Sequence, residues 1–135
     1  MACEPIRDEE DGPIGTITLN PPDDGNMRTL QMCHEVRDCI NATRRESRTR
    51  MIALTGAGEK FFCIGGRKDG TEDTVPYAGT LATLEMYEAI EKLQKPVIAS
   101  VNGFAVGGGN VLQMLCDCTA AKEREACLWT TEEIT

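Results

Sequence analysis

The sequence is poor in aromatic side chains and in histidine. Aromatic residues make up 4% of the 135 residues, and His34 is the only histidine. With so few rings, a hydrophobic core has to be built mainly from aliphatic residues, alanine, cysteine and methionine. One histidine and no Cys-x-x-Cys pair give no ligand set with zinc spacing, so we expect no metal site. For His34 we expect a surface or half-buried position on a helix, and no catalytic role.

Long apolar runs and an excess of basic residues are also missing. No run approaches the roughly 18–20 apolar residues of a membrane span, and no secretory signal pattern is visible at the start. Lys and Arg number 14 against 22 Asp and Glu, a net charge of -8, which argues against a nucleic-acid partner. A small anion held by local charges and backbone N–H groups stays possible. The seven cysteines, an odd number, indicate reduced thiols and a cytoplasmic protein.

The length predicts one domain, and the apolar pattern predicts alternating strands and helices, hence an α/β protein. We expect residues 1–13 to form a flexible acidic N-terminal arm or an edge strand, and residues 14–135 to form the domain. Short apolar or β-branched runs predict strands, and apolar spacing of three and four predicts helices. The expected strands are 15–19, 51–55, 97–101 and 117–121, and the expected helices are 27–43, 80–93 and 111–116.

Three of these elements carry a more detailed expectation about burial. The strand at 97–101 is apolar enough to be covered on both faces. The helix at 111–116 is expected to be short and buried. The helix at 80–93 is expected to turn one apolar side inward, formed by Leu81, Leu84, Tyr87, Ile90 and Leu93.

Glycine clusters follow two of the predicted strands. Gly56-x-Gly58 lacks the third glycine of a dinucleotide fingerprint, so simple turn glycines are expected there. Three consecutive glycines, 107–109, precede a predicted helix, at a cost in chain entropy. They make sense where backbone approaches a ligand, because free N–H groups at a helix start stabilise an anion. An oxyanion hole needs two such donors, and Gly65-Gly66 is a candidate for the second; tight packing is the alternative.

Residues 95–109, KPVIASVNGFAVGGG, followed by Leu115-Cys116-Asp117, resemble the core signature of the crotonase, or enoyl-CoA hydratase/isomerase, superfamily. Upstream, residues 17–21, ITLNP, and 54–66, LTGAGEKFFCIGG, resemble its first two motifs. Order and spacing agree over residues 14–128. The resemblance implies a truncated crotonase-like ββα spiral fold, because typical members are roughly twice as long.

The same resemblance implies an acyl-CoA thioester as substrate, with coenzyme A as part of that substrate and no tightly bound cofactor. Two backbone N–H groups, by motif position those of Gly66 and Gly108, would stabilise an enolate or a related oxyanion. The loop around Ile64 and Gly65 would lie beside the adenine or pantetheine of CoA.

Two positions depart from the family pattern. Val111 stands where the hydratases carry a catalytic Glu and cannot transfer a proton, so simple hydration is disfavoured. This part of the sequence resembles instead the branch with naphthoate synthase and the ring-opening ketocyclohexanecarboxyl-CoA hydrolase. Arg67 replaces the usual Asp after the second glycine pair. With Lys68 it is a candidate for contacts to CoA phosphates, or else a solvated loop cation.

The chain also stops early for this family. Glu132 matches the second catalytic Glu if one residue is inserted near Glu125, and is otherwise an exposed charge near the end. With half of the usual core, exposed apolar surface is expected, and self-association as a trimer or swapped assembly would cover it. The leading prediction is enolate- or oxyanion-stabilising chemistry on acyl-CoA. The alternative is a non-catalytic CoA-ester-binding or oligomerising module.

Overall fold

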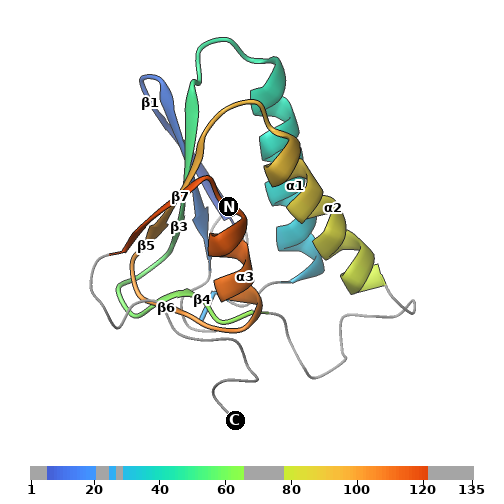
Figure 1. Cartoon of the computed structure of the whole chain (residues 1–135), viewed down its shortest axis with the longest axis vertical. Helices are drawn as coiled ribbons and strands as arrows, with labels where there is room; N and C mark the ends of the chain where they lie inside the picture. Colours follow the sequence, from blue (N-terminus) through green and yellow to red (C-terminus); the bar gives the residue numbers. More distant parts are fainter. Residues whose placement is uncertain (1–5, 21–24, 27–28, 66–77, 122–135) are drawn as a thin grey trace.

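The computed structural model describes residues 6–20, 25–26, 29–65 and 78–121, which form a mixed α/β structure (Figure 1). Within them, five strands form one sheet in the order β1-β2-β3-β5-β7, and two form a small second sheet, β4-β6. The strands are β1 (Ile6–Asp11), β2 (Ile14–Leu19), β3 (Met51–Gly56), β4 (Phe61–Cys63), β5 (Val97–Val101), β6 (Phe104–Ala105) and β7 (Cys118–Ala121). The helices are α1 (Leu30–Arg45), α2 (Ala78–Lys92) and α3 (Gly108–Leu115).

The large sheet is parallel except at its first strand. β1 pairs antiparallel with β2, from Ile6 opposite Leu19 to Asp11 opposite Ile14. The pairs β2–β3, β3–β5 and β5–β7 are parallel. An edge strand therefore occupies residues 6–11 of segment 1–13, one of the two expectations for it, while the boundary between arm and domain stays a prediction.

The core lies between one face of the large sheet and the paired helices α1 and α2, which run side by side in Figure 1. Inward side chains alternate along the strands, as a half-buried sheet requires. They are Ile17 and Leu19 on β2, Ile52 and Leu54 on β3, and Val97, Ala99 and Val101 on β5. The expectation that 97–101 is covered on both faces is wrong for the described chain, because Ser100 is exposed and Ile98 only partly buried.

Helix α1 follows the predicted pattern with a shifted start. Met32, Cys33, Val36 and Ile40 are buried on one side. The helix begins at Leu30 rather than at 27, because the Thr29 side chain accepts a hydrogen bond from the Met32 N–H at 3.1 Å. Such a cap satisfies one of the free N–H groups of the first turn. His34 is half-buried in the middle of this helix.

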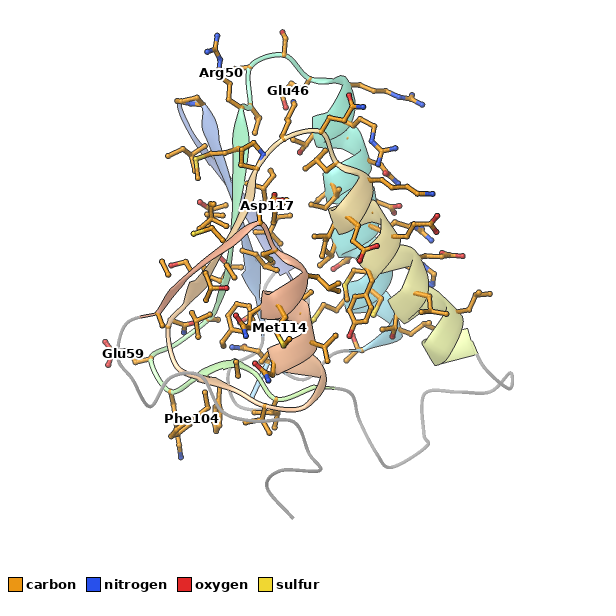
Figure 2. The ribbon with its side chains drawn as sticks, viewed as in Figure 1. Glu46, Arg50, Glu59, Phe104, Met114 and Asp117 are labelled. Atoms are coloured by element: carbon orange, nitrogen blue, oxygen red, sulfur yellow. The ribbon has the colours of Figure 1, made fainter. Side chains whose placement is uncertain are left out.

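The expected inward side of α2 is wrong in its first half. Leu81 and Leu84 are 59% and 56% exposed. The buried side is formed instead by Ala82, Thr83, Met86, Ala89, Ile90 and Leu93. Helix α3 was expected to be buried, yet Val111 is 37% and Met114 68% exposed. Figure 2 labels Met114 on this helix. Both helices therefore present apolar side chains to solvent within the described part of the chain.

Polar contacts fix the helix pair. The Arg37 guanidinium of α1 pairs with Glu85 of α2 at 2.6 Å. The Lys95 ammonium, in the connection after α2, donates to the Thr43 carbonyl at 2.6 Å and also to the Glu46 carbonyl at the end of α1. A cation on these last carbonyls satisfies acceptors that have no partner inside the helix.

Candidate functional site

The two glycine clusters meet where β4 ends and α3 begins. Gly65 follows β4 with a φ of +94°, a conformation that side chains rarely adopt. A Cβ placed on Gly65 would lie 3.0 Å from the Gly108 nitrogen and 3.5 Å from the Val106 carbonyl oxygen. Gly65 therefore has to be glycine for its conformation and for the close approach of the two chain segments.

The Gly108 N–H is a donor without a hydrogen bond among the described residues. Gly108 is the first residue of α3, and no side chain caps the helix start. The neighbouring N–H groups of Gly109 and Val111 donate to the carbonyls of Val106 and Gly107 at 2.9 and 3.1 Å. Among the described residues, no acceptor lies within hydrogen-bonding distance of the Gly108 N–H. A free N–H at the positive end of a helix is the kind of donor an oxyanion needs.

Close backbone packing holds α3 on β4. A Cβ on Gly109 would lie 1.8 Å from the Cys63 carbonyl oxygen, so only glycine fits there. The same carbonyl accepts the Val106 N–H at 3.0 Å. The alternative of tight packing therefore applies to Gly109, the third glycine, while Gly108 keeps an unbonded N–H beside Gly65.

Two asparagines, Asn26 and Asn102, hold the start of β4. The Asn26 Nδ2 group donates to the carbonyls of Ala57, Phe61 and Phe62 at 3.1, 2.9 and 3.1 Å. The Asn102 Nδ2 group donates to the Gly58 carbonyl at 2.8 Å and to the Phe61 carbonyl at 3.1 Å. The available signal was an Asn beside a Gly in both turns, Gly25-Asn26 and Asn102-Gly103, which predicts turns but not these contacts.

Gly56 also differs from its expected role as a turn glycine. It is the last residue of β3, and a Cβ there would lie 2.6 Å from the Phe61 carbonyl oxygen and 2.7 Å from Asn26 Nδ2. The physical requirement is close approach of backbone. Gly58, with a φ of +82°, is a turn glycine as expected.

Of the predicted site residues, Ile64, Gly65 and Gly108 are described, and they lie at the junction of β4 and α3. Ile64 is half-buried, and its N–H donates to the Gly25 carbonyl at 3.1 Å. The remaining predicted site residues lie outside the described residues: Gly66, Arg67, Lys68 and Glu132. Their roles stay predictions.

The motif Leu115-Cys116-Asp117 has a structural role at the far end of α3. The Asp117 carboxylate accepts the Val97 N–H at 2.7 Å, and the Asp117 N–H donates to the Val97 carbonyl at 2.8 Å. Burial, and then the nearby negative charge of Asp117, raise the pKa of the Cys116 thiol to about 12. A thiol with so high a pKa is neutral near pH 7 and is no nucleophile.

Within the described segments, no group of three or more His, Cys, Asp and Glu side chains is arranged to hold a metal ion. No helix in this part of the chain has the length and apolar character needed to cross a membrane.

Comparison with known proteins identifies the family. The family model of enoyl-CoA hydratase/isomerase matches residues 9–134. The chain belongs to the enoyl-CoA hydratase/isomerase family. Solved structures agree with this assignment. A Bacillus anthracis enoyl-CoA hydratase is 31% identical, with a TM-score of 0.78 over 87% of this chain and 47% of its own length.

Two further structures show the same fold and the same partial coverage. Pseudomonas aeruginosa DspI is 27% identical, with a TM-score of 0.84 over 96% of this chain and 54% of its own. An enoyl-CoA hydratase from Polaromonas sp. JS666 is 26% identical, with a TM-score of 0.78 over 86% and 47%. The crotonase-like fold is thereby confirmed, and the chain spans about half the length of these structures.

Proposed function

We propose that this chain binds acyl-CoA thioesters and stabilises an enolate or related oxyanion on the thioester carbonyl. The Gly66 and Gly108 N–H groups would both donate to that oxygen. The observation that carries the proposal is the unbonded Gly108 N–H at the start of α3, with Gly65 packed against the same nitrogen. Removal of one such donor typically lowers a rate by about 10²–10³-fold.

The family uses CoA thioesters without a tightly bound cofactor, and we propose that the segment around Ile64 contributes to binding that substrate. In the proposal, Ile64 and Gly65 lie beside the pantetheine or adenine of CoA, and Arg67 and Lys68 contact its phosphates. Since the CoA phosphates are strongly negative and the chain has a net charge of -8, local cations are needed to bind them.

The proposed reaction class depends on Val111, which follows Gly108 in the first turn of α3. Val111, 37% exposed on α3, offers no proton, so the proposal favours carbon–carbon chemistry of the naphthoate synthase type over hydration. Glu132 is the proposed acid or base. We expect hydration of crotonyl-CoA by this chain to be poor, measured as loss of absorbance of the conjugated thioester.

The deciding test is calorimetric titration with acetoacetyl-CoA, which reacts slowly, beside free CoA. We expect acetoacetyl-CoA to bind at micromolar concentration and more tightly than CoA. Gly108→Pro removes the donor and should abolish that difference and any turnover, because proline is tolerated at the first position of a helix and the N–H it replaces is unbonded. Gly108→Ala keeps the N–H and is the matched control. Unchanged thioester preference in a folded Gly108→Pro protein would contradict the assignment.

A second candidate function is favoured by the exposed apolar side chains. Leu81, Leu84, Val111 and Met114 are at least 37% exposed on α2 and α3, and contact with a second copy is one way to cover exposed apolar side chains. A non-catalytic, oligomerising module that holds CoA esters would cover them. Binding of acetoacetyl-CoA with no turnover, by a protein that sediments as a trimer or other homo-oligomer, would favour this function. Cytoplasmic localisation is proposed for both functions.

A further inference from the structure

Strand β4 carries the Gly65 segment toward α3, but its own pairing is too short to define its position. β4 has three residues and β6 has two, and the register between them shifts between Phe61 and Cys63. Only two residue pairs join these strands. Other contacts must therefore set where β4 ends, and with it where Gly65 lies.

At the end of β4, the Cys63 carbonyl accepts the Val106 N–H at 3.0 Å. At its start, two side-chain contacts converge on one atom. The Phe61 carbonyl oxygen accepts a hydrogen bond from Asn26 Nδ2 at 2.9 Å and from Asn102 Nδ2 at 3.1 Å. Asn26 comes from the turn before α1 and Asn102 from the turn between β5 and β6. Two side chains from distant parts of the sequence therefore fix the first residue of β4.

Each asparagine also fixes the chain on either side of that atom. Asn26 donates to the carbonyls of Ala57 and Phe62, and the adjoining Gly25 carbonyl accepts the Ile64 N–H at 3.1 Å. Asn102 accepts the Gly56 N–H at 3.0 Å through Oδ1. The backbone from the end of β3 to Ile64 is thus held at several points by amide groups.

The burial of Asn26 indicates that its Nδ2 hydrogen bonds, and not only the space that its side chain fills, are important at this position. Asn26 is fully buried, adopts a φ of +54°, and its Oδ1 atom has no hydrogen-bond partner. A buried acceptor without a partner is unfavourable, so an apolar side chain would be the cheaper way to fill the space. An amide suits this position because its Nδ2 group donates to the carbonyls of Ala57, Phe61 and Phe62.

We infer that Asn26 and Asn102 are positioning residues for the oxyanion site: by holding the Phe61 carbonyl together, they set the position of Gly65 relative to the Gly108 N–H. Neither side chain touches the substrate in this account. The functional part of the inference rests on the proposed oxyanion chemistry, whereas the geometric part does not.

The decisive variant is Asn102→Asp. It keeps the shape and the Oδ1 acceptor for the Gly56 N–H, but it replaces both N–H donors by a carboxylate oxygen that faces two carbonyls. Asn26→Ala removes the other half of the contact. Asn41→Ala is the matched control, because Asn41 is an exposed asparagine on α1.

Two readouts separate this inference from the proposed function. The first is the amide signals of Gly65 and Gly108 in ¹H–¹⁵N spectra of the ligand-free protein. We expect both to shift or broaden in Asn102→Asp and Asn26→Ala and to stay in place in Asn41→Ala. The second is the ratio of the dissociation constants of CoA and acetoacetyl-CoA, which we expect to fall by at least about tenfold in the two site variants, as when a well-aimed donor is lost.

The two readouts fail in different ways. Unmoved glycine signals in folded Asn102→Asp would overturn the positioning role, whatever the binding data show. Moved signals with an unchanged ratio would overturn the link to the oxyanion site. If the unmodified protein does not prefer acetoacetyl-CoA over CoA, the proposed function fails, and the glycine signals alone then decide the geometric part. If Asn26→Ala does not fold, the partly exposed Asn102 still decides it.

Discussion

Gly109→Ala tests whether contact between backbones fixes the start of α3. Gly109 lies in the first turn of α3 with its α-carbon against β4. An added Cβ would lie 1.8 Å from the Cys63 carbonyl oxygen and 2.5 Å from the Cys63 carbonyl carbon. Both neighbours are backbone atoms, so no side-chain rotation can relieve the overlap. The backbone at the start of α3 or at the end of β4 therefore has to shift to make room for the added Cβ.

Two opposing terms set the size of the effect. Alanine in a helix is favoured over glycine by about 1 kcal/mol. Extra carbon in a closely packed site typically costs about 1–3 kcal/mol, and the cost is highest where only backbone can yield. We therefore expect Gly109→Ala to lower the free energy of unfolding by about 1–2 kcal/mol, out of a total of roughly 5–15 kcal/mol for a domain of this kind.

The assay is urea denaturation followed by circular dichroism, with Gly15→Ala as the control. A Cβ on Gly15 would meet only side-chain atoms, Ile52 Cδ1 at 3.2 Å and Thr49 Cγ2 at 3.3 Å. Since those atoms can shift by a few tenths of an ångström, we expect a change below about 0.5 kcal/mol. Equal stability of Gly109→Ala and the unmodified protein would refute the idea that this contact fixes α3.

Four further predictions concern the thiols, the helix pair and the end of α1. Because the folded pKa of Cys116 is raised from 9.0 to about 12, stability should fall as pH rises between these values, and Cys116→Ala should flatten that part of the pH–stability curve. Alkylation at pH 8, followed by mass spectrometry, should modify the exposed Cys118 well before Cys116. A double-mutant cycle with Arg37→Gln and Glu85→Gln should give a coupling of about 0.5–1 kcal/mol that shrinks in high salt; no coupling at low salt would show the pair to be incidental. Lys95→Met should cost about 1 kcal/mol in urea denaturation, and an unchanged midpoint would mean that water replaces its bonds at the end of α1.

The sequence predicted the elements whose signals are local. Strand β5 has the predicted bounds, and helix α1 was misplaced by three residues only because Thr29 was not recognised as its cap. β1 carries four consecutive acidic residues, which gave no preference for a strand over an arm. β1 is a strand because it pairs with β2, and a local sequence pattern does not show which strands will pair.

The inward side of α2 failed for a related reason. Leu81 and Leu84 fit a helical apolar spacing, but the side that packs is decided by the neighbouring elements, and the buried residues are Ala82, Met86 and Ala89 instead. A periodic pattern identifies a helix and leaves its rotation undecided when apolar residues surround it. The same holds for α3, where Val111 and Met114 face outward.

For the site, motif spacing predicted which glycines matter, and it did not predict what holds them. That Gly65 approaches Gly108 follows from the placement of a separate two-stranded sheet against α3. The hydrogen bonds of the buried Asn26 amide could not be predicted, because a segment rich in Asn, Pro and Gly predicts only a turn. Side-chain contacts over more than thirty residues of sequence depend on the whole fold.

Catalysis by this chain would need both a placed N–H donor and a group that transfers a proton. The structure describes the first of these and not the second. The residues that position the Gly108 N–H and the Gly65 segment lie between Gly25 and Val111. That range belongs to the half of the family fold that this chain shares with its relatives. The proton donor is different, because Val111 removes the carboxylate expected on α3 and Glu132 lies outside the described residues. Binding of a thioester oxygen can therefore persist where turnover does not. An affinity for acetoacetyl-CoA that responds to Gly108→Pro, in a protein with no measurable turnover, would place the chain among binders rather than enzymes.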